Sequence, residues 1–198
     1  MPVTVTCVDE LARRIRRLTA LQPVVVVGIA GYGGSGKTTL ARALLERLPE
    51  AARVHGDDFL DPIGSRERSD EWAALLRDEL GAVLDALRAG ERAVFRPVDW
   101  ATGGRQSARV ASSATVQLVD AVGLLHPALL PRLDLSVWID VPLATATERG
   151  MHRDRAEGDD HDALWREVWE PNERGFAERY RPRETADVRF VPAAPGAP

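Results

Sequence analysis

The stretch Gly31-Tyr32-Gly33-Gly34-Ser35-Gly36-Lys37-Thr38 decides the fold of this chain, because it matches the G-x-x-x-x-G-K-[ST] phosphate-binding loop at every fixed position. A β-rich run at residues 24–29 precedes it, and a helical pattern at residues 39–45 follows it. Strand, glycine loop and helix in this order are the context that the motif requires. The glycines let backbone N–H groups approach phosphate oxygens, and the helix N-terminus adds partial positive charge. We therefore predict a nucleotide-phosphate site at Gly31, Gly33, Gly34, Ser35, Gly36, Lys37, Thr38 and Thr39.

Two side chains of this loop carry specific chemistry. Lys37 is predicted to reach the β- and γ-phosphates, and Thr38 to offer its hydroxyl to Mg²⁺. Lys37 is the only lysine in the chain, and every other strong base is an arginine. A compact ammonium fits inside a phosphate loop that a planar guanidinium would crowd, so a lysine at this position supports the motif.

Length and composition are those of a globular protein. The 198 residues carry a net charge of −4, and 44% of them are hydrophobic. The negative net charge does not favour nucleic-acid binding. The chain has no apolar run of about 18 residues, so we expect no membrane span. The single cysteine, Cys7, excludes a disulfide framework and a cysteine metal site. Residues 1–9 lack the layout of a signal peptide, so we expect a cytoplasmic protein with one domain at 1–191 and a disordered tail at 192–198.

Two adjacent carboxylates follow the second predicted strand, at residues 52–55. Asp57 and Asp58 stand directly after its end, in a polar turn. Because the carboxyl ends of parallel strands meet at one edge of a sheet, we expect both side chains to face the phosphate loop. One of them could accept a proton from an attacking hydroxyl, or hold the water shell of Mg²⁺. Simple capping of the turn is the alternative.

Hydrophobic periodicity predicts the remaining elements. The pattern indicates helices at 8–18, 70–88 and 143–154, a last helical region broken at Pro171, and strands at 93–95, 116–120, 135–140 and 188–191. Residues 101–113 show no periodicity. We predict an α/β, three-layer P-loop NTPase fold, in which helices flank a five-stranded parallel sheet. Residues of about 149–163 are predicted to form a small lid.

Three further side chains stand where this fold places phosphate chemistry. Asp120 ends a hydrophobic strand, which is the pattern of a metal-side carboxylate, so we predict that Thr38, Asp57 and Asp120 surround Mg²⁺. Arg149 and Arg153 are four residues apart and share one helix face, so they could converge on a transferring phosphoryl group. A solvated arginine-rich face is the alternative for this pair.

The order of these motifs resembles the uridine kinase/phosphoribulokinase/pantothenate kinase group of phosphate-loop kinases. The resemblance rests on the phosphate loop, the Asp-x-Phe at Asp57 to Phe59, the Val-Asp-Trp at Val98 to Trp100, and the Arg-x-x-x-Arg of the lid. It spans residues 24–191 and is closest to short bacterial uridine kinase-like proteins, whose C-terminal signature resembles Trp169, Pro171 and Glu173.

This resemblance implies roles for individual residues. Asp57 takes the position of the family's catalytic base, with Lys37, Arg149 and Arg153 acting on the phosphates of ATP. Asp99 matches an acidic position that contacts acceptor hydroxyls, and Trp100 an aromatic that could stack on a base. The predicted acceptor side comprises Asp58, Arg96, Asp99 and Trp100.

We therefore expect an ATP- and Mg²⁺-dependent kinase that phosphorylates a hydroxyl of a small molecule, with a nucleoside such as uridine as the preferred acceptor. The oligomeric state is left open between a monomer and a homodimer.

Other functions stay open. A sugar, pantothenate-like molecule or nucleotide could be the acceptor, and Arg96, Arg105 and Arg109 could bind the phosphate of a nucleotide. The chain has Asp120-Ala121 where the family usually has Glu-Gly. This departure favours an alternative function, that of a nucleotide-binding protein without transferase activity. Residues 120–123 spell the D-x-x-G of GTPases, but with one lysine and one asparagine (Asn172) the chain lacks their Asn-Lys-x-Asp motif.

Overall fold

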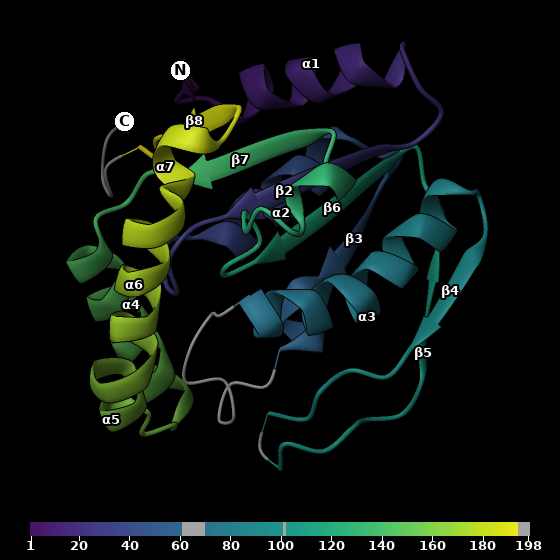
Figure 1. Cartoon of the computed structure of the whole chain (residues 1–198). Coiled ribbons are helices and arrows are strands. Elements are labelled where there is room, and N and C mark those ends of the chain that lie inside the picture. The colour runs from purple at the N-terminus through teal and green to yellow at the C-terminus, as the bar shows by residue number, and fades with distance from the viewer. Residues whose placement is uncertain (61–69, 101, 194–198) are drawn as a thin grey trace.

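Six parallel strands form the central sheet of the computed structural model, which describes residues 1–60, 70–100 and 102–193 (Figure 1). Across the sheet the strands run in the order β1-β8-β7-β2-β6-β3. Their bounds are β1 (Val3–Val5), β2 (Val25–Ala30), β3 (Ala51–His55), β6 (Val116–Ala121), β7 (Leu135–Ile139) and β8 (Val188–Phe190). The predicted α/β fold with a parallel sheet is confirmed, whereas the predicted count of five strands is wrong.

The prediction differs from the structure in the number of strands in the main sheet and in a separate two-stranded hairpin. The strand at 93–95 does not join the main sheet; it is β4 (Arg92–Phe95), which pairs antiparallel with β5 (Arg109–Ser112). Neither β5 nor β1 was predicted. Both are only three or four residues long, too short for a periodic signal.

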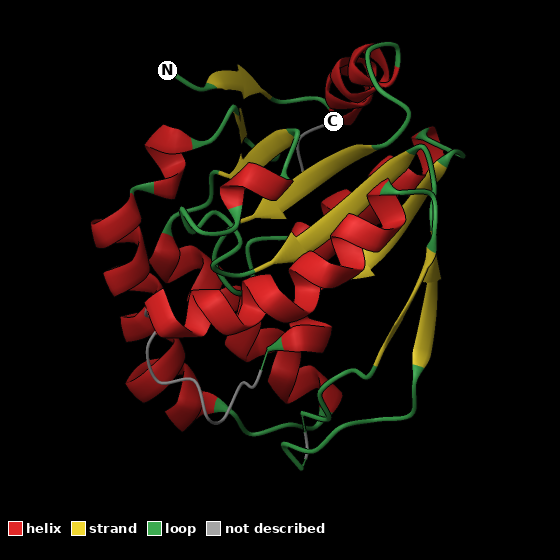
Figure 2. Ribbon diagram, turned by 45° about the vertical axis from the view of Figure 1, so that its right-hand side comes forward, coloured by secondary structure: helices red, strands yellow, loops and turns green. Residues whose placement is uncertain are grey.

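Helices cover both faces of the sheet and make three layers (Figures 1 and 2). α1 (Val8–Thr19) and α2 (Lys37–Arg47) pack on one face, where their leucines meet Val25 and Val27 of β2. α3 (Asp70–Arg88) packs on the other face, against Val26. Successive β2 residues point to opposite faces, so an unbroken valine run is what a strand buried on both sides requires.

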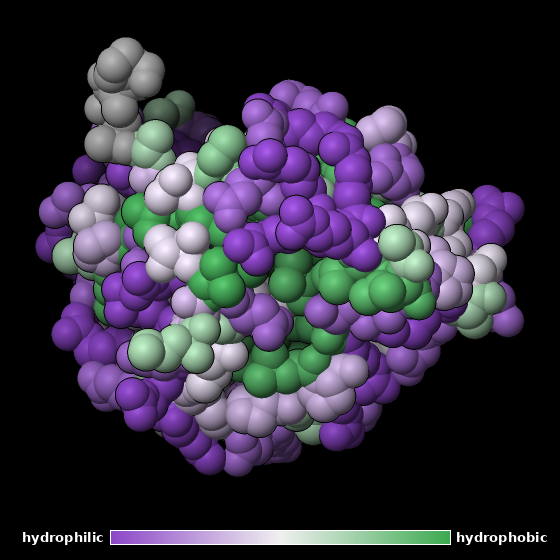
Figure 3. Space-filling view, turned by 90° about the horizontal axis from the view of Figure 1, so that it is seen from above, coloured by the Kyte–Doolittle hydropathy of each residue, from purple (hydrophilic) through white to green (hydrophobic). Residues whose placement is uncertain are grey.

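α1 lies at the top of the molecule in Figure 1; its side chains Leu11 and Ile15 are buried, and Arg13, Arg16 and Arg17 are exposed. Seen from above, hydrophilic residues gather over part of this face, and hydrophobic residues are exposed beside them (Figure 3). No helix within the described ranges is long and apolar enough to cross a membrane.

The C-terminal third continues as α4 (Leu143–Glu157), α5 (Asp162–Leu164), a π-helical turn η3 (Trp165–Trp169), α6 (Glu170–Tyr180) and α7 (Pro182–Thr185). The chain does not break at Pro171, which lies in the first turn of α6, where a proline needs no N–H donor. The helix geometry instead changes from π to α just before it. Of the predicted tail, residues 194–198 lie outside the described residues.

Candidate functional site

A cavity of about 590 Å³ opens at the carboxyl ends of β2 and β3. Its walls come from the phosphate loop, from the 3₁₀ turn η1 (Gly56–Phe59) after β3, and from α4, η3 and α6. Ten of the predicted site residues line it: Gly33, Gly34, Gly36, Lys37, Thr38, Thr39, Asp57, Trp100, Arg149 and Arg153. Gly31, Ser35, Asp58, Arg96, Asp99 and Asp120 do not.

The phosphate loop turns sharply into α2. Gly34 and Gly36 adopt φ values of +77° and +102°, which strain any residue with a side chain. Gly36 caps α2 without a side-chain hydrogen bond, so the first N–H groups of the helix are left for a ligand. Lys37 is only 8% exposed, and its Nζ donates to the carbonyl oxygens of Gly31 (3.1 Å) and Tyr32 (2.9 Å). The sequence therefore builds a positively charged cradle at this end of the cavity.

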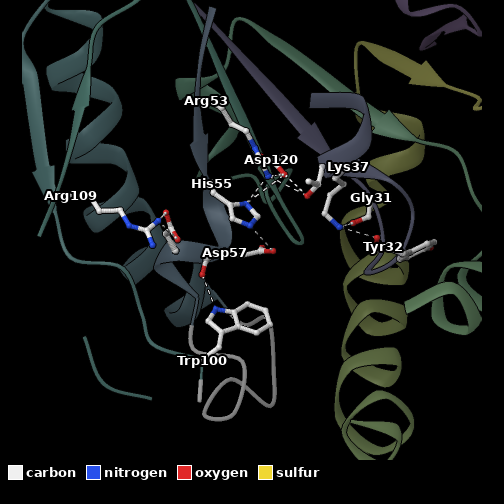
Figure 4. A network of polar contacts seen from close by, with 11 residues as sticks. Gly31, Tyr32, Lys37, Arg53, His55, Asp57, Trp100, Arg109 and Asp120 are labelled. Atoms are coloured by element: carbon white, nitrogen blue, oxygen red, sulfur yellow. Dashed lines mark hydrogen bonds and ion pairs between the residues drawn. The ribbon is translucent and has the colours of Figure 1, made fainter. Parts of the chain in front are cut away.

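Behind the cradle, Asp120 is fully buried and paired with Arg53 (Figure 4). Arg53 Nε donates to Asp120 Oδ1 at 2.6 Å, and Nη2 donates to Oδ2 at 2.7 Å. The Thr38 hydroxyl also donates to Oδ2, at 3.2 Å. Burial raises the pKa of Asp120, but hydrogen bonds from His55 and Arg53 outweigh it and leave this pKa below its ordinary value.

His55 stands between Asp120 and Asp57. Its Nδ1 is 3.1 Å from Arg53 Nη2 and 3.6 Å from Asp120 Oδ2, and its Nε2 is 3.9 Å from Asp57 Oδ2. Because a guanidinium only donates, Nδ1 accepts from Arg53 when the ring is neutral and faces Asp120 as a donor when it is protonated. The interaction with Asp120 raises the pKa of His55, although burial opposes this.

Asp57 presents its carboxylate to the cavity from η1. Its Oδ1 is buried and has no hydrogen-bond partner within the described residues. Its backbone oxygen accepts the indole N–H of Trp100 at 3.1 Å, which holds this tryptophan over the turn (Figure 4). Because Asp57 lines the cavity, its carboxylate can turn toward an acceptor hydroxyl or a metal ion without breaking a hydrogen bond of Oδ1.

The other predicted acceptor residues make contacts outside the cavity. Asp58 pairs with Arg109 at 3.1 Å, Arg96 Nε donates to the carbonyl of Gln106 at 3.1 Å, and Asp99 Oδ1 accepts the N–H of Thr102 at 3.3 Å. Each contact links residues on or near the β4–β5 hairpin. Their assignment to the acceptor stays a prediction that the cavity lining does not support.

Arg149 and Arg153 of α4 form part of the cavity wall. Arg153 binds the neighbouring Asp154 through Nε and Nη2, at 3.0 and 2.6 Å. Arg149 makes no hydrogen bond or ion pair in the described part of the chain, so its guanidinium has no such contact to break before it binds an anion.

The comparisons with known proteins agree with this geometry. A family model described as AAA domain (AAA_33) matches residues 26–178, a range that includes the phosphate loop, Asp57, Asp120 and α4. The chain belongs to this family of P-loop kinase domains.

Individual relatives share its kinase character. This P-loop kinase domain is 30% identical over 144 residues to uridine kinase of Chloroflexus aggregans, an alignment that covers 67% of this chain and 69% of that protein. It is 36% identical over 70 residues to human nicotinamide riboside kinase 2, covering 33% of this chain and 30% of that one. A putative fructose transport system kinase from Silicibacter sp. TM1040 has the same fold, with a TM-score of 0.72, 24% identity, and coverage of 96% and 100%.

Sequence reasoning about the kinase domain predicted Trp100 but missed the three rings that form one wall with it: His161, Trp165 and Trp169. Trp165 and Trp169 meet edge to face with centroids 4.9 Å apart, and Trp169 lies 5.6 Å from His161 and 6.5 Å from Trp100. All four line the cavity. The spacing of Trp165 and Trp169 had indicated only a helical region, because ring contacts between distant segments leave no periodic signal.

Two glycines and a glutamate dock this wall on the phosphate loop. A Cβ at Gly33 would lie 2.7 Å from Trp165, and one at Gly150 of α4 would lie even closer to the same indole. Glu173, 6% exposed, accepts the N–H of Gly33 at 3.1 Å. Trp165 Nε1 in turn donates to Asp154 at 2.8 Å. These contacts fix the position of η3 and α4 of the kinase domain relative to the phosphate loop.

The oxygen donors at the mouth of the cavity suit Mg²⁺, which prefers carboxylates, hydroxyls and water. Asp57 and Thr38 both line the cavity, and Asp57 Oδ1 has no hydrogen-bond partner within the described residues, whereas both oxygens of Asp120 are held by Arg53. Within the described ranges, no group of three or more His, Cys, Asp or Glu side chains is arranged to hold a metal by itself. A metal here would therefore take most of its ligands from substrate and water.

Proposed function

We propose that this kinase domain transfers the γ-phosphoryl group of ATP to a hydroxyl of a small acceptor, and that the acceptor is a nucleoside such as uridine. One observation carries the proposal. A single cavity joins the phosphate loop, with Lys37 and Thr38, to a carboxylate of Asp57 that has an unpartnered oxygen.

The residues divide the chemistry among them. Asp57 Oδ1 accepts the proton of the attacking hydroxyl, which then adds to the γ-phosphorus in line with the leaving β-phosphate oxygen. Lys37, Arg149 and Arg153 offset the charge that develops on the transferred group. Bound beside Thr38 and Asp57, Mg²⁺ would supply charge neutralisation between the β- and γ-phosphates.

Water must be excluded from such a site, because an open one would hydrolyse ATP. The proposed lid, residues 149–163, carries Arg149 and Arg153 and continues into the aromatic wall. Because Trp165 keeps α4 docked on the loop, Arg149 and Arg153 would stay at the phosphates, and closure of the rest of the lid would exclude water.

A nucleoside acceptor is favoured by the aromatic wall and by the relatives. Trp100 is 42% exposed, lines the cavity and is tied to Asp57, so a planar base could pack on it while its sugar hydroxyl faces the carboxylate. Relatives named uridine kinase and nicotinamide riboside kinase support the same class.

A nucleotide-binding role without transfer is the second candidate. Asp120-Ala121 is the sequence departure that favours it, and the pairing of Asp120 with Arg53 removes a carboxylate from the metal side. This alternative requires nucleotide affinity with no turnover on any acceptor.

The test is an acceptor screen with ATP and Mg²⁺ against pyrimidine nucleosides, nicotinamide riboside, simple sugars, pantothenate and nucleoside monophosphates. For the best acceptor, Asp57→Asn should lower turnover by about 10²–10⁴-fold, the range for a general base. Asp78→Asn, an exposed carboxylate on α3, is the matched control and should retain wild-type turnover. Full activity of Asp57→Asn would refute the base assignment, and ATP binding without transfer to any acceptor would favour the second candidate.

A further inference from the structure

Arg53 is an unusual occupant of the metal side of the site. It comes from β3, and its guanidinium binds both oxygens of Asp120 at the end of β6, at 2.6 and 2.7 Å (Figure 4). Residues 51–55 of β3 pair in register with residues 116–120 of β6, so the two strands bring this side chain to that carboxylate. The pair is bidentate, the strongest arrangement of these two groups.

One nitrogen of Arg53 lies where a cation would. Nη2 is 2.7 Å from Asp120 Oδ2 and 3.2 Å from Thr38 Oγ1. The Thr38 hydroxyl gives its proton to Asp120 Oδ2, so the oxygen lone pair that a divalent cation would use instead accepts from Arg53. A metal ion held by Thr38 and Asp120 together would have to displace this guanidinium.

Burial makes this pairing strong. Asp120 is fully buried, and the Arg53 side chain is 19% exposed. An isolated carboxylate at such a depth needs a compensating charge, and Arg53 supplies it without a bound ligand. Asp57, by contrast, lines the cavity and keeps one oxygen unpartnered in the described part of the chain. Before any metal binds, the Asp120 carboxylate is therefore already paired with a cationic side chain, whereas the Asp57 carboxylate still has an oxygen without a hydrogen bond.

We propose that Arg53 is the resident counter-ion of Asp120 and competes with a divalent cation for it, so that the cation is held from Thr38 and Asp57 without Asp120. The inference builds on the proposed function only in placing a metal ion beside Thr38. Arg53 is a positioning residue in this scheme: it fixes the Thr38 hydroxyl and withholds one carboxylate from the metal.

The experiment titrates Mn²⁺ into the full chain and follows the electron paramagnetic resonance signal of free Mn²⁺, once with the metal alone and once with ADP. Arg53→Gln should tighten Mn²⁺ binding by about tenfold, the scale on which groups around a ligand change metal affinity. Asp120→Asn should leave the wild-type affinity within about twofold but abolish the gain in the Arg53→Gln background. Arg88→Gln removes a remote arginine from Asp134 and should change nothing.

Unchanged or weaker Mn²⁺ binding by Arg53→Gln in both titrations would overturn the proposal. If Arg53→Gln alone does not fold, the double variant Arg53→Gln/Asp120→Asn decides, because it leaves no unpaired buried charge. Wild-type affinity in the double variant supports the proposal, and a loss of about tenfold would make Asp120 a metal ligand. The titration with the metal alone needs neither nucleotide nor acceptor, so its outcome is separate from that of the phosphoryl-transfer test.

Discussion

At the scale of single residues, Gly150 shows how tightly α4 packs against η3. A Cβ there would clash with the Trp165 indole, which cannot swing away easily because its Nε1 donates to Asp154. Gly150→Ala should therefore lower the free energy of unfolding by about 1–3 kcal/mol, the usual cost of overpacking, despite the better helix propensity of alanine. Urea unfolding measures the change.

Gly175 provides the control, because a Cβ there would meet no atom within 4 Å. Gly175→Ala should leave stability unchanged or raise it by up to about 1 kcal/mol, as expected for an exposed helical position. Equal effects of the two substitutions would show that Trp165 does not pack as described.

Trp100 is the residue on which acceptor preference depends. The Trp100 ring lies on the cavity wall, and its N–H donates to the backbone oxygen of Asp57. Trp100→Ala should therefore raise KM for a nucleoside acceptor by about two- to tenfold, which corresponds to the loss of an aromatic contact of about 0.5–1.5 kcal/mol. KM for ATP should not change, and Trp100→Phe should restore most of the loss. A rise in KM for ATP instead would place Trp100 on the nucleotide side.

At the scale of elements, Asp154 of α4 accepts a hydrogen bond from Trp165, which joins α4 to η3, and others from its neighbour Arg153. Burial raises its pKa, but these bonds outweigh burial and hold the pKa below its ordinary value. Folding therefore favours the ionised form. The resulting stabilisation is complete above the ordinary carboxyl pKa of about 3.9 and is lost as the pH falls through the lowered folded value.

Unfolding by urea between pH 7 and pH 3, with wild type beside Asp154→Asn, measures this effect. The difference in stability should be constant at neutral pH and shrink only below a pH of about 4. A difference that stays constant throughout the acid range would mean that the Asp154 charge does not hold the two elements together.

The elements that sequence could predict are the long and periodic ones. The range of α3, residues 70–88, follows from leucines spaced along one face, and β2 follows from its valine run. β1 and β5 could not be found, because each is short and is defined by its partner strand rather than by its own pattern. The hairpin containing β5 carries Asp58's partner, Arg109, which is why the acceptor side was the weakest part of the prediction.

At the scale of the whole molecule, strand order assembles the site. β2 and β3 both pair with β6, so the phosphate loop, Asp57 and Asp120 meet at one edge, as the rule for parallel sheets predicts. The rule does not say which side chains will bind one another there. Nothing in the sequence marked Arg53 as the partner of Asp120, because their contact depends on the register between two strands that are 61 residues apart in the chain, from His55 to Val116.

The most direct test of phosphoryl transfer with Asp57 as the base is a single-turnover measurement with γ-³²P-labelled ATP and the best acceptor. Wild type should move the label to the acceptor, while Asp57→Asn binds ATP within about twofold of wild type but transfers label at least about 100-fold more slowly. Transfer by Asp57→Asn at the wild-type rate would contradict the account, as would a wild-type protein that binds ATP and passes the label to no acceptor.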